Sequence, residues 1–449
     1  MWVPRWLMAD PHAPAVPVSG EVRAALTTFL TMAYILVVNP MLLGSAIAID
    51  GVDPFGELLT ATALAAAFGC IAMGLLGRHP FALAPGMGLN AYFAFEVVGA
   101  RGVPWQTALG AVFLSGLLFV ALSVSGVRGW VAQAIPKPLQ VGVVAGIGLF
   151  LAHLGLQSAG VVVDHPATLV TLGDVAYPGV WLLGVGLAVM VAFHARGRSE
   201  ALLVGIGGIT LMCAVLGLPV WQGDTFAAPA GGWVQAPAWP THLLGQLDLR
   251  GAWSLGLLDV VFIFLFVDFF DTTGTLVGLA QRANATGPDG SLRRARGAYL
   301  ADALATVFGA WVGTSTTTAY IESAAGVEAG GRTGLTAVLV GALFLLSLVF
   351  WPILSVVPGV ATAPALVWVG LSMVAGLRAL DPEDRPALIS ACLAAIVMPL
   401  TISIANGIAA GIIAWVALHL VAGRRTAVSS VTAVLAVLLV IRYAWLAGG

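Results

Sequence analysis

Charged residues are scarce in this chain of 449 residues. Asp, Glu, Lys and Arg together make up 9% of it, whereas hydrophobic residues make up 59% and the mean hydropathy is +0.99. Soluble domains carry about 25% charged residues. A water-soluble protein of this length could not cover its surface with so few charges, so lipid must be its main solvent. The net charge of −2 does not indicate a nucleic-acid partner, and we expect none.

Cysteine is also scarce, and the common catalytic motifs are missing. Cys70, Cys213 and Cys392 lie inside apolar runs without paired spacing, which favours core packing over a disulfide or a metal cluster. The sequence contains no GxSxG, HExxH, Walker A or CxxC pattern. We therefore predict no metal, no cofactor and no enzymatic activity.

Long apolar runs follow a proline-rich tail, residues 1–20, which lacks the apolar stretch of a signal peptide. A membrane-spanning helix needs roughly 20 apolar residues, and fewer if it ends in a cavity. The predicted spans are 24–48, 59–77, 81–98, 105–125, 139–156, 178–194, 201–221, 255–280, 298–313, 315–330, 334–357, 361–377, 386–400 and 402–422. A further apolar segment covers 427–447.

The basic residues predict the orientation. With the N-terminus in the cytoplasm, 16 of the 19 Lys and Arg residues fall on the inner side, and Arg101, Arg250 and Arg442 fall outside. The positive-inside rule requires this bias. We therefore predict a multi-pass protein of the cell (inner or plasma) membrane with a cytoplasmic N-terminus. The sequence leaves open whether segment 427–447 crosses the membrane.

The spacing of the spans indicates an internal repeat. The first span starts near 24 and the eighth near 255 (255 − 24 = 231), and a similar offset relates the third span to the tenth and the fourth to the eleventh. Because each copy would hold seven spans, an odd number, the second copy must be inverted in the membrane. Inverted repeats are typical of secondary transporters, whose substrate site lies at the repeat interface near the midplane.

The third and tenth segments are interrupted in corresponding ways. The third, Phe81–Phe95, contains Pro85-Gly86, and the tenth, Thr314–Gly326, opens with a run of hydroxyl residues. Both features disfavour helix, so we expect each segment to be half extended and half helical. Unwound backbone at membrane depth is tolerated where it lines a cavity or is buried in protein. The alternative is a pair of short helices that use Gly and Ser for close packing.

Few carboxylates lie within the predicted spans, and a buried charge is costly enough to make each a functional candidate. Asp268 and Asp271 lie at i and i+3 on one face of the eighth span, and Glu322 begins the helical half of the tenth. Protons, a metal cation or a ligand with several N–H donors could neutralise them. The alternative is structural acids bonded to Ser and Thr hydroxyls. The complete set is Asp268, Asp271, Asp302 and Glu322, with Asp259, Glu96 and Glu328 nearer the span ends.

Several long motifs give the chain a family resemblance. It resembles the nucleobase–cation symporter 2 family, and within it the adenine/guanine/hypoxanthine permeases of the azaguanine-resistance type. The similarity runs from about Glu21 to Gly423. The matching stretches are Leu26–Pro40, Phe81–Phe95, Pro166–Asp174, Phe266–Thr275 and Gly313–Gly334.

The resemblance implies an all-α polytopic membrane protein with a uracil-permease-like fold. That fold has fourteen transmembrane helices in two inverted seven-helix repeats, with half-helices at spans 3 and 10. It also implies a homodimer in which a core domain moves against a gate domain. The implied divisions are a tail (1–20), a core (21–130 and 255–357), a gate (131–254 and 358–425) and an extra C-terminal segment (426–449).

The same resemblance implies the site residues. In such proteins, an acid on span 8 and an acid or amide on span 10 hold the base, and these positions match Asp268 and Glu322. The Gly and Asn of the third segment match Gly88 and Asn90. The full expected substrate-binding set is Asp268, Glu322, Gly88, Asn90, Ile321, Tyr320, Thr272 and Thr31. The expected proton-coupling set is Asp268, Asp271 and Glu322.

We therefore predict import of purine bases (hypoxanthine, guanine, adenine and xanthine) by proton symport. Two carboxylates suit the N–H groups of a purine edge, and Phe93, Phe95, Phe269 or Tyr320 could cover the ring. The alternatives are sodium coupling, an anion transporter of the same fold, a membrane-embedded enzyme and an ion channel. The acids disfavour anions, and no catalytic constellation supports an enzyme. The sequence ranks neither the purines nor the coupling ions.

Overall fold

The computed structural model describes residues 2–9, 16–125, 136–198, 200–221, 225–229, 232–253, 258–287 and 292–448. Contacts divide the chain into two compact units. The first combines Met1–Gly126 with Asp174–Ala365, and the second combines Val127–Gly173 with Leu366–Gly449. The predicted core lies inside the first unit apart from residues 127–130. Residues 174–254, which we predicted to belong to the gate, group with the first unit by contact. The division into core and gate remains a prediction.

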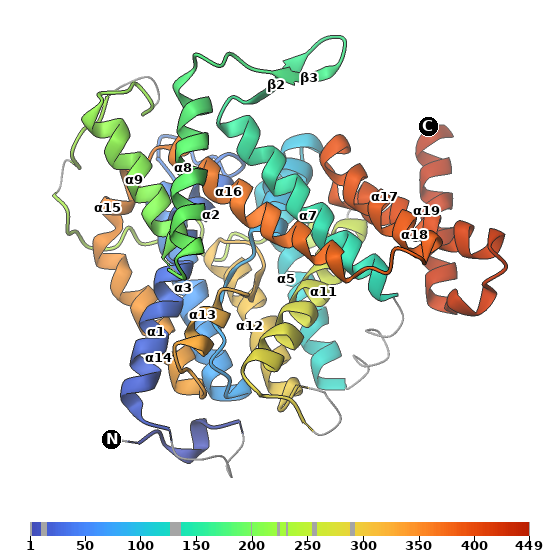
Figure 1. Ribbon diagram of the computed structural model, residues 1–449, viewed down its shortest axis with the longest axis horizontal. Helices are drawn as coiled ribbons and strands as arrows, with labels where there is room; N and C mark the ends of the chain where they lie inside the picture. The colour runs from blue at the N-terminus through green and yellow to red at the C-terminus, as the bar shows by residue number, and fades with distance from the viewer. Residues whose placement is uncertain are drawn as a thin grey trace. The chain divides into compact units, whose positions relative to one another are not determined.

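Helices dominate the first unit (Figure 1). Its longer helices are α1 (Val18–Met32), α2 (Ile35–Gly44), α3 (Phe55–Ala72), α5 (Trp105–Ser125), α8 (Pro178–Ala195), α9 (Ala201–Val215), α11 (Leu258–Arg282), α12 (Ala295–Val312) and α14 (Gly334–Ser347). The short helices are η1 (Arg5–Leu7), η2 (Met73–Gly77), α10 (Leu249–Ala252), η4 (Leu348–Phe350) and α15 (Trp351–Ser355). Helix α16 (Gly359–Val374) crosses the unit boundary.

The second unit is built on α7 (Lys137–Ser158), α17 (Arg385–Thr401) and α18 (Ile404–Val421). These helices pack closely, and a Cβ at Gly142 of α7 would lie 2.5 Å from the carbonyl oxygen of Ala391. The remaining elements are η5 (Ala375–Ala379), η6 (Arg425–Ala427), α19 (Ser430–Gly448) and a hairpin of β2 (Val162–His165) and β3 (Leu169–Leu172). In the hairpin, Val162 pairs with Leu172 and His165 with Leu169.

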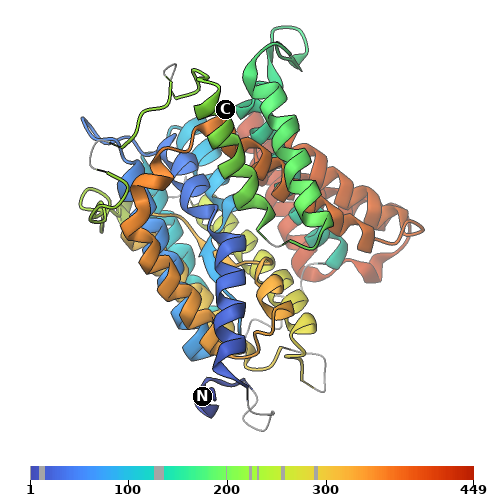
Figure 2. The same ribbon diagram turned by 60° about the vertical axis from the view of Figure 1, so that its left-hand side comes forward.

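The length and apolar character of the helices fit a membrane protein. Among the described residues, nine helices are long and apolar enough to cross a membrane, and three shorter apolar helices accompany them. The C-terminal apolar segment is one of these shorter helices, within α19. Helices α1 and α2 form one apolar run that turns at Ala33 and Tyr34, and this turn positions Tyr34. In Figures 1 and 2, α14 (orange) lies along α1 and α3 (blue).

The two interrupted segments form the centre of the first unit. The third segment consists of strand β1 (Leu83–Pro85), α4 (Met87–Ala91) and η3 (Tyr92–Ala100). The tenth consists of strand β4 (Thr317–Ala319) and α13 (Ser323–Glu328). The predicted half-extended, half-helical structure is confirmed for both.

The strands of these segments pair with each other. They run antiparallel, and Leu83 lies opposite Ala319, Ala84 opposite Thr318, and Pro85 opposite Thr317. The Gly86 N–H donates to the Thr316 carbonyl at 2.9 Å. Since β1 and β4 are buried, this pairing satisfies backbone groups that lipid could not.

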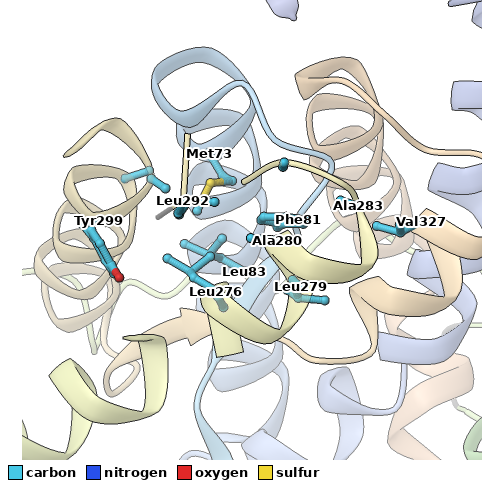
Figure 3. Close-up of a cluster of buried hydrophobic side chains, with 14 of the residues drawn as sticks. Met73, Phe81, Leu83, Leu276, Leu279, Ala280, Ala283, Leu292, Tyr299 and Val327 are labelled. Carbon is cyan, nitrogen blue, oxygen red and sulfur yellow. The ribbon is translucent and has the colours of Figure 1, made fainter. Parts of the chain in front are cut away.

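An apolar cluster fixes α11 against both interrupted segments (Figure 3). Leu276 and Leu279 of α11 are fully buried with Phe81 and Leu83, and Val327 of α13 joins them. Because lipid tails are as apolar as leucine, such contacts stabilise a membrane protein through close packing more than through removal from water. The cluster holds the acids on α11 in register with β4 and α13.

Candidate substrate site

Two acids within α11, Asp268 and Asp271, have different surroundings. The carboxylate of Asp268 is 1% exposed and accepts a hydrogen bond from Thr306 of α12 at 3.2 Å. Asp271 is half-buried and lies near Thr318 of β4 and within electrostatic range of Glu322. The structure therefore brings Asp271 close to Glu322.

Glu322 occupies the N-cap position of α13 and is half-buried. The hydroxyl of Tyr34, at the turn between α1 and α2, donates to Glu322 Oε1 at 2.9 Å. A hydroxyl donor to an ionised carboxylate forms a strong, charge-assisted hydrogen bond. This bond fixes the orientation of the Glu322 side chain and joins α1–α2 to the tenth segment.

Tyr320 links the two interrupted segments. It is 5% exposed, and its hydroxyl donates to the Pro85 carbonyl at 2.5 Å, close to both Glu322 and Asp271. The next residue, Ile321, is 49% exposed. The backbone therefore turns from a buried tyrosine to an accessible isoleucine and then to the Glu322 carboxylate.

The surface of α11 beside Asp271 is open. Gly274, one turn after Asp271, is exposed, and a Cβ placed there would meet no other atom within 4 Å. A Cβ at Gly278, another turn on, would lie 3.9 Å from the Ile321 Cδ1 atom. Positions i, i+3 and i+7 share one helix face. Accessible space therefore adjoins Asp271, and Ile321 borders it.

The predicted residues of the third segment differ in accessibility. Asn90 is fully buried, and its amide donates to Asn39 Oδ1. The Asn39 amide in turn donates to Thr62 at 2.8 Å and to Thr314 at 3.0 Å. Gly88 is half-buried. Asn90 thus belongs to a buried amide network that ties α2 and α3 to both interrupted segments.

The remaining expected contacts are buried to different degrees. Thr31 is 4% exposed, and its hydroxyl donates to the Thr28 carbonyl of its own helix at 2.7 Å. Phe93 is fully buried and Phe269 is 2% exposed, so both rings are packed inside the protein. Phe95 is half-buried. Of these three phenylalanines, Phe95 has the most accessible ring in this conformation.

Two buried Asp–Thr pairs join α11 to α12. Thr272 of α11 donates to Asp302 Oδ2 of α12 at 2.8 Å, and Thr306 of α12 donates to Asp268 of α11. Each helix thus contributes an aspartate and, one turn later, a threonine. Thr272, Asp302 and Thr306 are fully buried. Burying these carboxylates requires such hydrogen bonds.

The acids near the span ends have basic partners, as expected for residues close to water. Arg101 donates to both Glu96 and Asp259, each at 2.9 Å. Arg282 and Glu328 form an exposed pair at 3.3 Å. The exposed Arg282–Glu328 pair contributes about 0–1 kcal/mol. Arg101 holds Glu96 and Asp259 in ion pairs, so we assign none of these acids a role at the site.

Sequence reasoning missed Tyr34 and Thr318 as parts of the site. Tyr34 lies in the quoted stretch Leu26–Pro40, and Thr318 lies in the hydroxyl-rich run. Nothing in the local sequence singles out either residue from the residues around it. Their partners are 288 and 46 residues away in the chain. Local pattern alone could not reveal these contacts.

Half-helices that meet at a buried ribbon, with carboxylates beside accessible space, are typical of membrane transporters built from inverted repeats. The chain belongs to the family described as "Permease family", whose profile matches residues 19–410. Its members are transporters, so the chain is a multi-pass membrane permease and not an enzyme.

Two relatives align over most of the chain. It is 44% identical over 402 residues to "Guanine/hypoxanthine permease PbuG" of Bacillus subtilis (strain 168), covering 88% of this chain and 89% of that protein. It is 41% identical over 422 residues to "Adenine permease AdeP" of Escherichia coli (strain K12), covering 94% of this chain and 92% of that protein.

A solved structure confirms the fold. The transmembrane domain of the cyanobacterial bicarbonate transporter BicA superposes with a TM-score of 0.62 at 14% identity. The match covers 87% of this chain and 97% of that one. The predicted uracil-permease-like fold of fourteen helices is therefore confirmed. At this identity, the likeness concerns the fold alone.

Proposed function

We propose that the protein transports purine nucleobases across the membrane. The observation that carries this proposal is the placement of Asp271 and Glu322 together beside Tyr34 and the open face of α11. Adenine and guanine/hypoxanthine permeases among the relatives support the same substrate class. We include xanthine among the substrates to be tested.

The chemistry of the pair suits the edge of a purine. Ionised carboxylates accept hydrogen bonds and do not donate them, whereas a purine edge presents ring N–H and exocyclic amino donors. Asp271 and Glu322 would each accept from one such group, and the Tyr34 hydroxyl would hold Glu322 in position. Asp268, the acid suggested by the family resemblance, is buried against Thr306, so its geometry supports direct contact with the base less well.

Anion transport is the rival function, because the bicarbonate transporter shares the fold. Two carboxylates at the site oppose an anion electrostatically. No fixed cation is evident on the described elements that supply Asp271, Glu322 and Tyr34 at the depth of these residues. The site therefore favours a neutral ligand rich in donors.

The transport cycle we propose is an elevator-like motion of core against gate, driven by proton symport in a homodimer of the cell membrane with a cytoplasmic N-terminus. Sodium is the alternative coupling ion. The carboxylates suit either cation, and we prefer the proton because a cluster of acids takes up a proton more readily than it holds uncompensated buried charge.

The test is uptake of radiolabelled hypoxanthine, guanine, adenine and xanthine, with sulfate and bicarbonate in parallel, into cells that lack their own purine permeases. We expect uptake of at least one purine, competed by the others, and none of either anion. Uptake of an anion without purine uptake would overturn the proposal.

A further inference from the structure

The half-helix of the tenth segment, α13, is bound at both ends to α1 and the turn that follows it. At its N-terminus, Glu322 accepts the hydrogen bond from Tyr34, at the turn between α1 and α2. At its C-terminus, the Ala329 carbonyl accepts two hydrogen bonds from Arg23, one from Nε at 3.0 Å and one from Nη2 at 2.8 Å. Because Arg23 lies near the start of α1 and Tyr34 just beyond its end, α1 and α13 run antiparallel.

The two helices also touch between these ends. Gly326 of α13 is buried, and a Cβ at this position would collide with the Thr28 hydroxyl and lie 2.9 Å from the Ala24 carbonyl oxygen. Small residues allow two helix backbones in a membrane protein to approach closely. Helix α13 therefore lies directly against the backbone of α1, and a shift of one helix must be felt by the other.

The short length of α13 makes its contacts with other elements important. It consists of only six residues, Ser323–Glu328. So short a helix satisfies few of its own backbone groups and is not stable alone. A second guanidinium, that of Arg332, donates to the Val327 carbonyl at 3.1 Å and to the Gly331 carbonyl at 3.2 Å. Arginines at this end of a helix bind its free carbonyl groups and oppose the negative end of its dipole.

We infer that Arg23 is a positioning residue of the substrate site, which acts through α13. Its guanidinium holds the C-terminal end of α13 on α1 and thereby keeps Glu322, at the other end, within reach of the Tyr34 hydroxyl and of the base. Ala329 and Glu322 are seven residues apart (329 − 322 = 7), about 10 Å along a helix, so Arg23 acts at a distance from the carboxylate. This role rests on the proposed function.

The expected consequence of losing the Arg23–Ala329 contact is a lower affinity for the base. Without it, α13 would occupy several positions, and Glu322 would be correctly placed in only a fraction of the molecules. The apparent affinity of a ligand falls in proportion to the fraction of molecules that can bind it. The net contribution of such hydrogen bonds corresponds to a loss of about three- to tenfold. The transport rate of loaded molecules should change little, because a bound base requires Glu322 to be in place.

Arg23 also belongs to the basic residues that predict the orientation of the chain. A role in orientation requires the positive charge alone. The contact with Ala329 requires a planar guanidinium, from which two N–H groups reach one carbonyl. Arg23→Lys separates these roles, because lysine keeps the charge and lacks the rigid pair of donors.

The first test is hydrogen–deuterium exchange of the purified full-length protein, which needs no substrate. We expect the amides of residues 323–331 to exchange about threefold faster or more in Arg23→Gln, and at an intermediate rate in Arg23→Lys. The matched control is Arg196→Gln. Arg196 is also exposed and donates to a carbonyl near a helix C-terminus, that of Ala192 in α8, but it does not bind α13. Unchanged exchange in Arg23→Gln, or equal acceleration in Arg196→Gln, would overturn the inference.

The second test is purine uptake, corrected for the amount of protein in the membrane. We expect Arg23→Gln to raise the KM about three- to tenfold with little change in the maximal rate, and Arg23→Lys to raise it less. Arg196→Gln should change neither quantity. A lower maximal rate with a wild-type KM in Arg23→Gln would assign Arg23 to folding alone and contradict the inference. Wild-type behaviour of Arg23→Lys in both tests would reduce Arg23 to its charge, with the same result.

The two tests separate this inference from the proposed function. Exchange in α13 does not depend on transport. If no purine is transported but the exchange rates change as expected, the proposed function fails and the contact between Arg23 and α13 keeps its positioning role. If purines are transported and the exchange rates of α13 do not change in Arg23→Gln, the function stands and the role of Arg23 is refuted.

Discussion

Asp268 and Asp271 are three residues apart and have different environments. The spacing places both on one side of α11, but their surroundings differ. Thr306 of α12 donates a hydrogen bond to Asp268, whereas Asp271 lies near Thr318 of β4 and Glu322. The exposed Gly274, one turn after Asp271, leaves that side of the helix accessible. A single turn of helix therefore separates a buried acid from an accessible one.

Substitutions at these acids should differ in effect. Asp271→Asn and Glu322→Gln should each weaken purine binding by at least tenfold, since a hydrogen bond to a charged group contributes about 1.5–3 kcal/mol. Asp268→Asn should affect binding less. Competition for hypoxanthine uptake gives the apparent affinities. Equal losses in Asp268→Asn and Asp271→Asn would contradict the assignment.

Gly86 illustrates a close backbone approach. A Cβ at this position would lie 2.8 Å from the Cγ2 atom of Thr318, whose hydroxyl must stay in place to keep its hydrogen bond with Thr272. Gly86→Ala should therefore cost about 1–3 kcal/mol of stability and reduce transport. Gly184→Ala on α8, where a Cβ meets nothing within 4 Å, is the control. Thermal unfolding in detergent compares the two, and equal melting temperatures would exclude the steric explanation.

His79, in the loop between η2 and β1, predicts a pH dependence. Burial lowers its pKa from 6.5 to about 4, although the hydrogen bond from Nε2 to the Arg293 carbonyl opposes this shift, and Arg294 adds to the lowering. Because the folded protein favours the neutral ring, its stability should fall as the pH drops from 6.5 towards 4. Thermal melts across this range should show a shallower slope in His79→Gln than in the wild type. An unchanged slope would exclude His79 as the cause.

At the scale of elements, local chemistry predicted both interrupted segments. Pro85-Gly86 and the threonine run break helices wherever they occur, so half-extended structure followed from the residues alone. The register of the strands, which places Leu83 opposite Ala319, could not be predicted from the residues alone, because it joins strands more than 230 residues apart (319 − 83 = 236). The hairpin of β2 and β3 was not predicted either, although its residues overlap a quoted stretch.

Glu21 shows how a long-range contact can cap a helix. It is fully buried at the start of α1 and accepts hydrogen bonds from the backbone N–H groups of Arg332 at 3.0 Å and Thr336 at 3.2 Å. The Thr336 hydroxyl also donates to it, at 2.5 Å. The Glu21 carboxylate, although it belongs to α1, thus lies at the N-terminus of α14 and accepts from backbone N–H groups that have no partner within that helix.

Removing this carboxylate should destabilise the first unit. Glu21→Ala leaves several buried donors unsatisfied, at about 1–3 kcal/mol for each group. Glu328→Ala removes an exposed acid whose ion pair contributes about 0–1 kcal/mol, so it serves as the control. Melting temperatures in detergent should fall clearly for the first variant and little for the second. A reversed order would show that Glu21 does not cap α14.

At the scale of the whole molecule, composition and the spacing of the apolar runs were enough to predict a polytopic helical membrane protein, and the interrupted segments and the family motifs predicted a permease. The scarcity of charge and the spacing of the spans follow from lipid as solvent. The partners of each acid could not be predicted, because they depend on helix packing that no local pattern encodes. The approach of α12 to α11 is the main example, since it brings Asp302 to Thr272.

The coupling ion can be tested on the whole protein. In liposomes with an inward pH gradient and no sodium, we expect purine accumulation that collapses when a protonophore dissipates the gradient. The physical reason is the cluster of acids, which takes up a proton more readily than it holds an unpaired charge. Accumulation that requires sodium and ignores the gradient would replace the proton with sodium in this cycle.

The ribbon of β1 and β4 has a consequence for how the gene could be divided. Each strand comes from a different half of the chain, so each half alone would present an unpaired strand edge. Hydrocarbon offers no partner for such an edge. Neither half should therefore assemble by itself, whereas two fragments cut between α9 and α11 and produced together could restore the ribbon. Within one chain, each half therefore supplies the strand that the other half needs to satisfy its backbone groups inside the membrane.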